Sequence, residues 1–144
     1  RVVLIRLASR TQTLRFLNNA PDELRRQLAQ ETLDLYAPLA NRLGVWQLKW
    51  ELEDYAFRYL EPQTYKHIAR QLDEKRIERE SYIAEAIGTL SAELAAAGVK
   101  AEVTGRPKHI FSIWNKMRLK GLDFDELYDV RGLRVLVDNV KDCY

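Results

Sequence analysis

The sequence contains few of the residue types that mark specialised small proteins. Its 144 residues include one cysteine, two histidines, four prolines and six glycines. Cys143 cannot form a disulfide within the chain, which favours a reducing compartment. His67 and His109 belong to no cluster with metal-ligand spacing, so a zinc site is not expected. Cys143 also has no base near it in sequence and no Gly-x-Ser-x-Gly motif occurs, so nucleophilic catalysis has no support.

Strong charge and long apolar runs are also missing. Lys and Arg number 23 against 21 Asp and Glu, and this net charge of +2 argues against a dedicated duplex-DNA-binding protein. No apolar run approaches the roughly 20 residues that a membrane-spanning helix requires, so no membrane partner is expected. The sequence is 47% hydrophobic and 31% charged, which is typical of a globular protein with a buried core.

The spacing of apolar residues changes at Gly98. Before this position it is helical, and the predicted helices cover residues 1–17, 22–43, 45–60 and 62–97. Pro38 is expected to interrupt the second helix, and the charged stretch 73–80 is expected to be an exposed part of a connecting helix. The elements predicted after Gly98 are a strand over 99–104, a turn at 105–107, a helix over 108–120 and a strand over 130–137. The predicted class is α+β: a mostly helical first part is followed by the start of a mixed α/β domain.

The strongest candidate site lies at the start of the predicted helix 108–120. Lys108, Ser112 and Lys116 are four residues apart, so on a helix they form one stripe that begins near its N-terminus, where free backbone N–H groups attract anions. Arg106 adds a guanidinium that can grip phosphate oxygens in pairs. This set predicts a polyphosphate-binding arrangement. The spacing differs from that of the Gly-rich phosphate loop, and from spacing alone an ordinary solvated face is the alternative.

Asp129 is the candidate metal ligand. It stands where the acidic segment 123–128 enters the predicted strand 130–137. Mg²⁺ often binds one or two carboxylates, with waters and substrate phosphates in its other positions. A carboxylate beside a basic phosphate site therefore suits Mg²⁺, and a turn or helix cap is the alternative.

Several runs of the sequence resemble the RelA/SpoT family. The runs GRPKHIFSIW (105–114) and DELYDVR (125–131) resemble the opening of that family's synthetase domain. The runs YAPLANRLG (36–44) and LKWELED (48–54) resemble the helical region before it. The likeness covers essentially the whole chain and is strongest to the long RelA-type (p)ppGpp synthetases. Because the chain begins at Arg1 without a methionine and stops soon after a predicted strand, we expect a piece of such a protein.

The resemblance implies a GTP pyrophosphokinase of the stringent response. Such an enzyme transfers pyrophosphate from ATP to the 3′-hydroxyl of GDP or GTP, and AMP is the other product. Carried over by motif, Arg106, Lys108, Ser112 and Lys116 would hold ATP, and Asp129 would ligate Mg²⁺. The general base, the guanine site and the parts that contact the ribosome and tRNA are expected beyond Tyr144. The enzyme is expected in the cytoplasm, and this piece alone is expected to be inactive.

The resemblance also implies a domain order. Residues 1–61 would end an HD-type hydrolase domain, 62–97 would be a connecting helix, and 98–144 would begin a nucleotidyltransferase-like synthetase domain.

The hydrolase-like part departs from the pattern of active members. They read LADRLHN where this chain has LASRTQT at 7–13, so Ser9 replaces a metal-binding carboxylate and Thr13 replaces an amide. Asn41 stands where active hydrolases commonly have histidine. We therefore expect this half not to hydrolyse (p)ppGpp. A bifunctional synthetase/hydrolase is one alternative, and a non-catalytic helical module with a regulatory or RNA-binding role is another.

Overall fold

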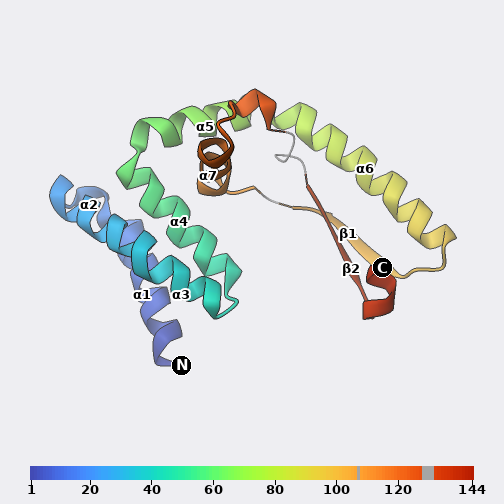
Figure 1. Ribbon diagram of the computed structural model, residues 1–144, viewed down its shortest axis with the longest axis horizontal. Coiled ribbons are helices and arrows are strands. Elements are labelled where there is room, and N and C mark those ends of the chain that lie inside the picture. Colours follow the sequence, from blue (N-terminus) through green and yellow to red (C-terminus); the bar gives the residue numbers. More distant parts are fainter. Residues whose placement is uncertain (107, 128–131) are drawn as a thin grey trace. The chain divides into compact units, whose positions relative to one another are not determined.

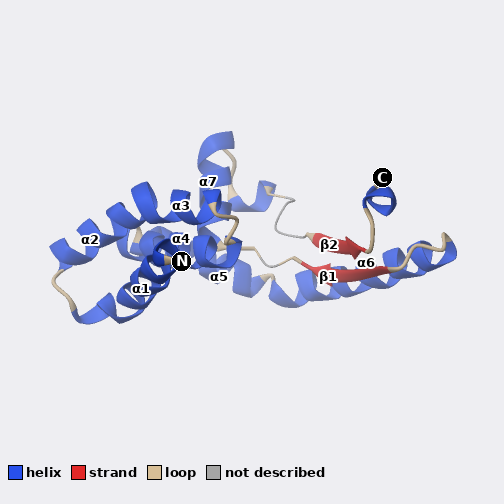
Figure 2. Cartoon of the chain, turned by 90° about the horizontal axis from the view of Figure 1, so that it is seen from below, coloured by secondary structure: helices blue, strands red, loops and turns tan. Residues whose placement is uncertain are grey.

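The computed structural model describes residues 1–106, 108–127 and 132–144, which form two compact units. The first unit comprises residues 1–69 and 109–114, and the second comprises 70–108 and 115–144. Helices make up most of the described chain, and two strands pair into one small sheet (Figures 1 and 2). The predicted α+β class is therefore confirmed.

The helices of the first unit follow the predicted breaks. They are α1 (Val2–Phe16), α2 (Asp22–Glu31), α3 (Ala37–Arg42), α4 (Trp46–Leu60) and the greater part of α5 (Pro62–Glu74). A short 3₁₀ turn (Leu17–Asn19) and Pro21 separate α1 from α2, and two carboxylates stand in the first turn of α2, where they favour the helix dipole.

The segment predicted as one helix over 22–43 changes its hydrogen-bonding pattern before Pro38. Thr32–Tyr36 form a π-helical turn, in which the Ala37 N–H bonds to the Thr32 carbonyl. Pro38 has no N–H for the helical ladder, and it stands where this turn gives way to α3. Gly44 follows with φ 71°, a left-handed conformation that glycine adopts at little cost, and the chain then turns into α4.

The core of the first unit lies where α1, α3 and α4 meet. These helices lie side by side in Figure 1, and the core combines aliphatic side chains with two alanines that let the backbones approach closely. Its buried members are Leu7, Leu14, Leu17, Ala37, Ala40 and Leu52.

The prediction of a single helix over 62–97 is wrong. Two helices, α5 and α6 (Arg76–Ala96), are separated at Lys75, whose φ of −93° and ψ of 9° leave the helical range. Lys75 pairs with Asp125, and its ammonium lies 5.8 Å from the centre of the Phe124 ring. These contacts with the segment after α7 favour the break, whereas the charge pattern of 73–80 gave no sign of it.

The sheet lies in the second unit. β1 (Ala101–Gly105) pairs antiparallel with β2 (Leu133–Val137), with Gly105 opposite Leu133 and Ala101 opposite Val137. A Cβ at Gly105 would lie 3.1 Å from Ile83 of α6, so glycine allows the end of β1 to pack tightly on that helix.

α7 (Ile110–Lys120) follows β1 and begins two residues later than predicted. The predicted domain limits at 61 and 97 stay predictions. Within the described ranges, no helix has both the length and the apolar character needed to cross a membrane.

Candidate functional site

Arg106 and Lys108 flank the backbone at the point where β2 begins. The Arg106 N–H donates to the Gly132 carbonyl at 2.7 Å. A Cβ at Gly132 would lie 3.6 Å from Arg106 Cβ and 3.8 Å from Lys108 Cε. Both cationic side chains therefore run beside Gly132, and the absent side chain of this glycine leaves room for them.

Lys116 and Lys120 belong to the same group of cations. Burial lowers the pKa of Lys116, and the positive charges of Lys108, Lys120 and Arg106 lower it further. Burial likewise lowers the pKa of Lys108, with Arg106 adding to the effect. We call Arg106, Lys108, Lys116 and Lys120 the cation cluster. Lys116 lies close enough to the other three for their charges to act on it, which makes this part of the surface attractive to a polyanion.

The stripe predicted on one helix is only partly present. Lys108 precedes α7 and does not lie on it, so only Ser112 and Lys116 occupy successive turns of that helix. Ser112 is exposed, whereas Lys108 and Lys116 are half-buried. Asp129, the predicted Mg²⁺ ligand, lies outside the described residues, as do Pro107 and residues 128, 130 and 131.

The sequence predicts that free N–H groups at the start of this helix attract an anion. In the structure, the first turn of α7 already has a partner. Asp54 of α4 accepts a hydrogen bond from the Phe111 N–H at 2.9 Å, so a carboxylate of the chain itself already caps this helix. Burial raises the pKa of Asp54, and the Phe111 N–H and His109 act in the opposite direction. The sequence gave no local signal for this contact, because 57 residues separate its partners.

Aromatic packing fixes the same turn of α7. The His109 ring stacks on Trp50 with centroids 4.7 Å apart and planes 18° apart. Phe57 of α4 contacts Phe111 and Trp114, with centroids 5.7 and 4.7 Å apart. The two tryptophans therefore pack within the unit, and α7 is held along its buried side.

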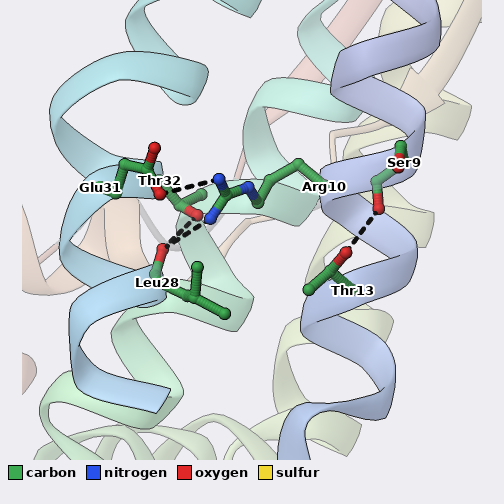
Figure 3. Close-up of polar contacts among 6 residues, drawn as sticks. All are labelled: Ser9, Arg10, Thr13, Leu28, Glu31 and Thr32. Atoms are coloured by element: carbon green, nitrogen blue, oxygen red, sulfur yellow. Dashed lines mark hydrogen bonds and ion pairs between the residues drawn. The ribbon is translucent and has the colours of Figure 1, made fainter. Parts of the chain in front are cut away.

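Side chains of the segment that resembles the hydrolase motif bond to the backbone of α1 and to residues of α2 (Figure 3). Thr13 Oγ1 donates to the Ser9 carbonyl at 3.0 Å within α1. Arg10 reaches α2, where it pairs with Glu31 at 2.8 Å and donates to the Leu28 carbonyl at 3.4 Å. Among the residues that the structure describes, no three His, Cys, Asp or Glu side chains gather in a way that could hold a metal ion.

Two family models match the chain at its two ends. Residues 1–46 match the model described as an HD domain, and residues 105–144 match the region found in RelA/SpoT proteins. The second match contains the cation cluster, and the first contains Ser9, Arg10 and Thr13.

The whole chain aligns with curated relatives named GTP pyrophosphokinase. It is 57% identical to the one from Photobacterium angustum, 58% identical to the one from Escherichia coli and 43% identical to the one from Myxococcus xanthus. Each alignment covers all of this chain but only 19% of the relative. The chain thus spans about one fifth of the length of these proteins.

Proposed function

This chain belongs to the RelA/SpoT family, and on that premise we propose that it supplies the ATP-binding start of a (p)ppGpp synthetase. The whole protein would transfer pyrophosphate from ATP to the 3′-hydroxyl of GDP or GTP in the cytoplasm. The rest of the protein would supply the general base, the guanine site and the contacts with ribosome and tRNA. The names of the relatives and the match over residues 105–144 support this assignment.

The reaction requires positive charge around the triphosphate. The 3′-oxygen attacks the β-phosphorus of ATP and forms a new bond there, while the bond from the β-phosphorus to the oxygen that bridges it to the α-phosphorus breaks. AMP leaves with that oxygen, and a base takes the proton of the 3′-hydroxyl. Catalysis of phosphoryl-type transfer relies mainly on positioning and on stabilisation of the phosphate charge.

The cation cluster is the observation that carries the proposal. Arg106, Lys108 and Lys116 lie close enough for their charges to lower the pKa values of the two lysines, and Arg106 and Lys108 share the backbone surface at Gly132. Their mutual repulsion would be relieved by a bound triphosphate. Ser112 would add a hydroxyl one turn before Lys116 on α7.

We propose Asp129 as the Mg²⁺ ligand of this site. One carboxylate together with phosphate oxygens and water is a donor set that Mg²⁺ commonly takes in nucleotide sites. Asp129 stands three positions before Gly132 in the sequence, against which Arg106 and Lys108 lie. The ion would neutralise charge on the phosphates while the cation cluster holds them.

We further propose that the HD-like half does not hydrolyse (p)ppGpp. Ser9 offers a neutral hydroxyl in place of the carboxylate of active members, and the Thr13 hydroxyl is already bonded to the helix backbone. Hydrolysis of (p)ppGpp by the purified full-length protein in the presence of Mn²⁺ would contradict this.

A transfer assay on the full-length protein tests the synthetase function. ATP labelled at the β-phosphate is supplied with GDP or with GTP, and we expect a labelled guanosine 3′-pyrophosphate and an equal amount of AMP. The double substitution Lys116→Ala and Asp129→Ala is expected to lower the rate about 100-fold or more, because two charge-stabilising contacts are lost.

Lys100→Ala is the matched control for the loss of one lysine. Lys100 also lies in the second unit, but its side chain is 90% exposed and pairs with Asp138 at 3.6 Å. Its substitution should leave the transfer rate within about twofold. If the wild-type protein transfers no label to GDP or GTP, the proposed function is refuted. If the double variant folds and transfers label at the wild-type rate, the assignment of Lys116 and Asp129 to the site is refuted.

A further inference from the structure

Asp54 holds the first turn of α7 at two points. Its Oδ1 accepts the backbone N–H of Phe111 at 2.9 Å, and its Oδ2 lies 3.4 Å from Nδ1 of His109. The two partners are residues 109 and 111, so one carboxylate bridges the residue before α7 and the second residue of the helix. A carboxylate at this position also favours the helix dipole.

Trp50 provides a third contact, one turn before Asp54 on α4. It stacks on the His109 ring at a centroid distance of 4.7 Å, so the ring is held both by its edge and by its face. Two of the three contacts hold the His109 side chain and one holds the Phe111 backbone N–H, so the chain is fixed on both sides of residue 110. α4 itself is anchored by Leu52, Ala56 and Phe57, all of which are buried.

Two sides of the His109 ring are held by residues of α4. Nδ1 faces Asp54, and the face of the ring stacks on Trp50. Nε2 is buried and has no hydrogen-bond partner within the described part of the chain. The ring is therefore positioned through Nδ1 and through its stacked face.

We propose that Asp54 is a positioning residue for ATP binding. His109 and Phe111, which Asp54 and Trp50 hold, stand in the sequence between Lys108 and Ser112, both of which we assign to ATP. Asp54 touches neither ATP nor a reacting atom in this scheme. It acts through His109 and the first turn of α7, so that both ATP-binding residues start from a fixed backbone. This inference rests on the proposed synthetase function.

Three variants of the full-length protein test the role of Asp54. Asp54→Ala removes both contacts, Asp54→Asn keeps an oxygen that can accept the Phe111 N–H, and Glu53→Gln is the control. Glu53 is the neighbouring residue on α4, is buried, and pairs within the helix with Lys49 at 2.8 Å. For each variant the KM for ATP, the KM for GDP, the Kd for ATP from equilibrium dialysis, and the melting temperature are measured.

We expect Asp54→Ala to raise the KM and Kd for ATP about 10-fold and to leave the KM for GDP within about twofold, because small displacements of binding groups weaken binding strongly. Asp54→Asn should restore part of the loss. Glu53→Gln should lower the melting temperature without changing the KM for ATP. If Asp54→Ala fails to fold, a rise of about threefold in the Kd for ATP in Asp54→Asn is the expected result.

The proposal is overturned if ATP and GDP binding weaken equally in the folded Asp54 variants, or if neither changes. In both cases the wild-type protein must still perform the transfer reaction. Absence of transfer by the wild-type protein would instead refute the proposed function.

Discussion

The backbone N–H of Arg106 donates to the carbonyl of Gly132 at 2.7 Å, which ties the residue after β1 to the residue before β2. The antiparallel register ends with Gly105 opposite Leu133, so this bond continues the ladder by one further step. The backbone of Arg106 is therefore positioned by the sheet, although the residue as a whole is exposed. The same glycine contacts the side chain of Lys108, so a single position influences two of the proposed ATP-binding residues.

The size of the residue at 132 should control ATP binding. An alanine Cβ would make ordinary contacts, 3.6 Å from Arg106 Cβ and 3.8 Å from Lys108 Cε. Gly132→Ala is therefore expected to keep the KM for ATP within about twofold. Gly132→Val adds two methyl groups that would displace Lys108 or Arg106, and we expect the KM for ATP to rise about fivefold or more. Equal KM values for ATP in the two variants would contradict this account.

Removal of one charge from the cation cluster should stabilise the protein while it weakens ATP binding. The pKa of Lys116 is lowered by burial and then by Lys108, Lys120 and Arg106, so the folded state binds this proton less tightly than the unfolded chain. Stability therefore rises with pH as the pH increases through the lowered pKa toward 10.5. At neutral pH we expect Lys116→Gln to raise the melting temperature of the ligand-free protein by about 1 °C.

Thermal unfolding of the full-length protein from pH 7 to pH 10, with and without ATP, measures both effects. The stabilising effect of Lys116→Gln should shrink as the pH rises, and the upward shift of the melting temperature by ATP should be smaller in the variant. A constant difference between variant and wild type over this range would show that charge repulsion at Lys116 contributes nothing.

Local sequence signals predicted most of the fold. Pro21, Gly44 and Gly98 ended or separated helices where expected, since their effects on the backbone depend on neighbouring residues only. The break at Lys75 was missed because its stabilising partners, Asp125 and Phe124, lie about 50 residues later. An alternating charge pattern fits an unbroken exposed helix equally well.

The candidate site was predictable in composition but not in geometry. The spacing predicts that Lys108 and Lys116 lie close together on one side of a helix. The two lysines do lie close together, but Lys108 precedes α7 and is not part of that helix. The part played by Asp54 could not be read from the sequence. A carboxylate on an amphipathic helix is usually solvated, and only the tertiary contact with Phe111 gives this one a distinct role.

The ionisation of Asp54 should make stability depend on pH. Burial raises its pKa above the ordinary 3.8, so the folded state holds this proton more tightly than the unfolded chain does. The stabilisation is complete below pH 3.8 and is lost as the pH rises through the raised folded-state pKa. We therefore expect Asp54→Asn to be more stable, relative to wild type, at pH 7 than at pH 4.

Urea unfolding of the full-length protein at several pH values between 4 and 7 measures this difference. Asp54 also borders a cleft of about 370 Å³ lined by Gln47, Glu51, Tyr55, Arg58, Tyr65 and His109. His109→Gln is examined in parallel, because His109 contacts the Asp54 carboxylate directly. The prediction fails if the relative stability of Asp54→Asn is independent of pH or falls toward pH 7.

Arg10 should be a stabilising residue of the HD-like half. Its side chain is 11% exposed, pairs with Glu31 at 2.8 Å and lies 4.2 Å from the centre of the Tyr36 ring. Arg10→Ala is expected to lower the free energy of unfolding by about 1–3 kcal/mol, because a charge-assisted hydrogen bond and a cation–π contact are both lost. Arg15→Ala is the matched control, since Arg15 is also on α1 but its pair with Glu51 is solvent-exposed, and we expect a clearly smaller loss there. Denaturant unfolding of the full-length variants measures both changes. Equal losses in the two variants would mean that the pair with Glu31 and the contact with Tyr36 stabilise the protein no more than an exposed ion pair does.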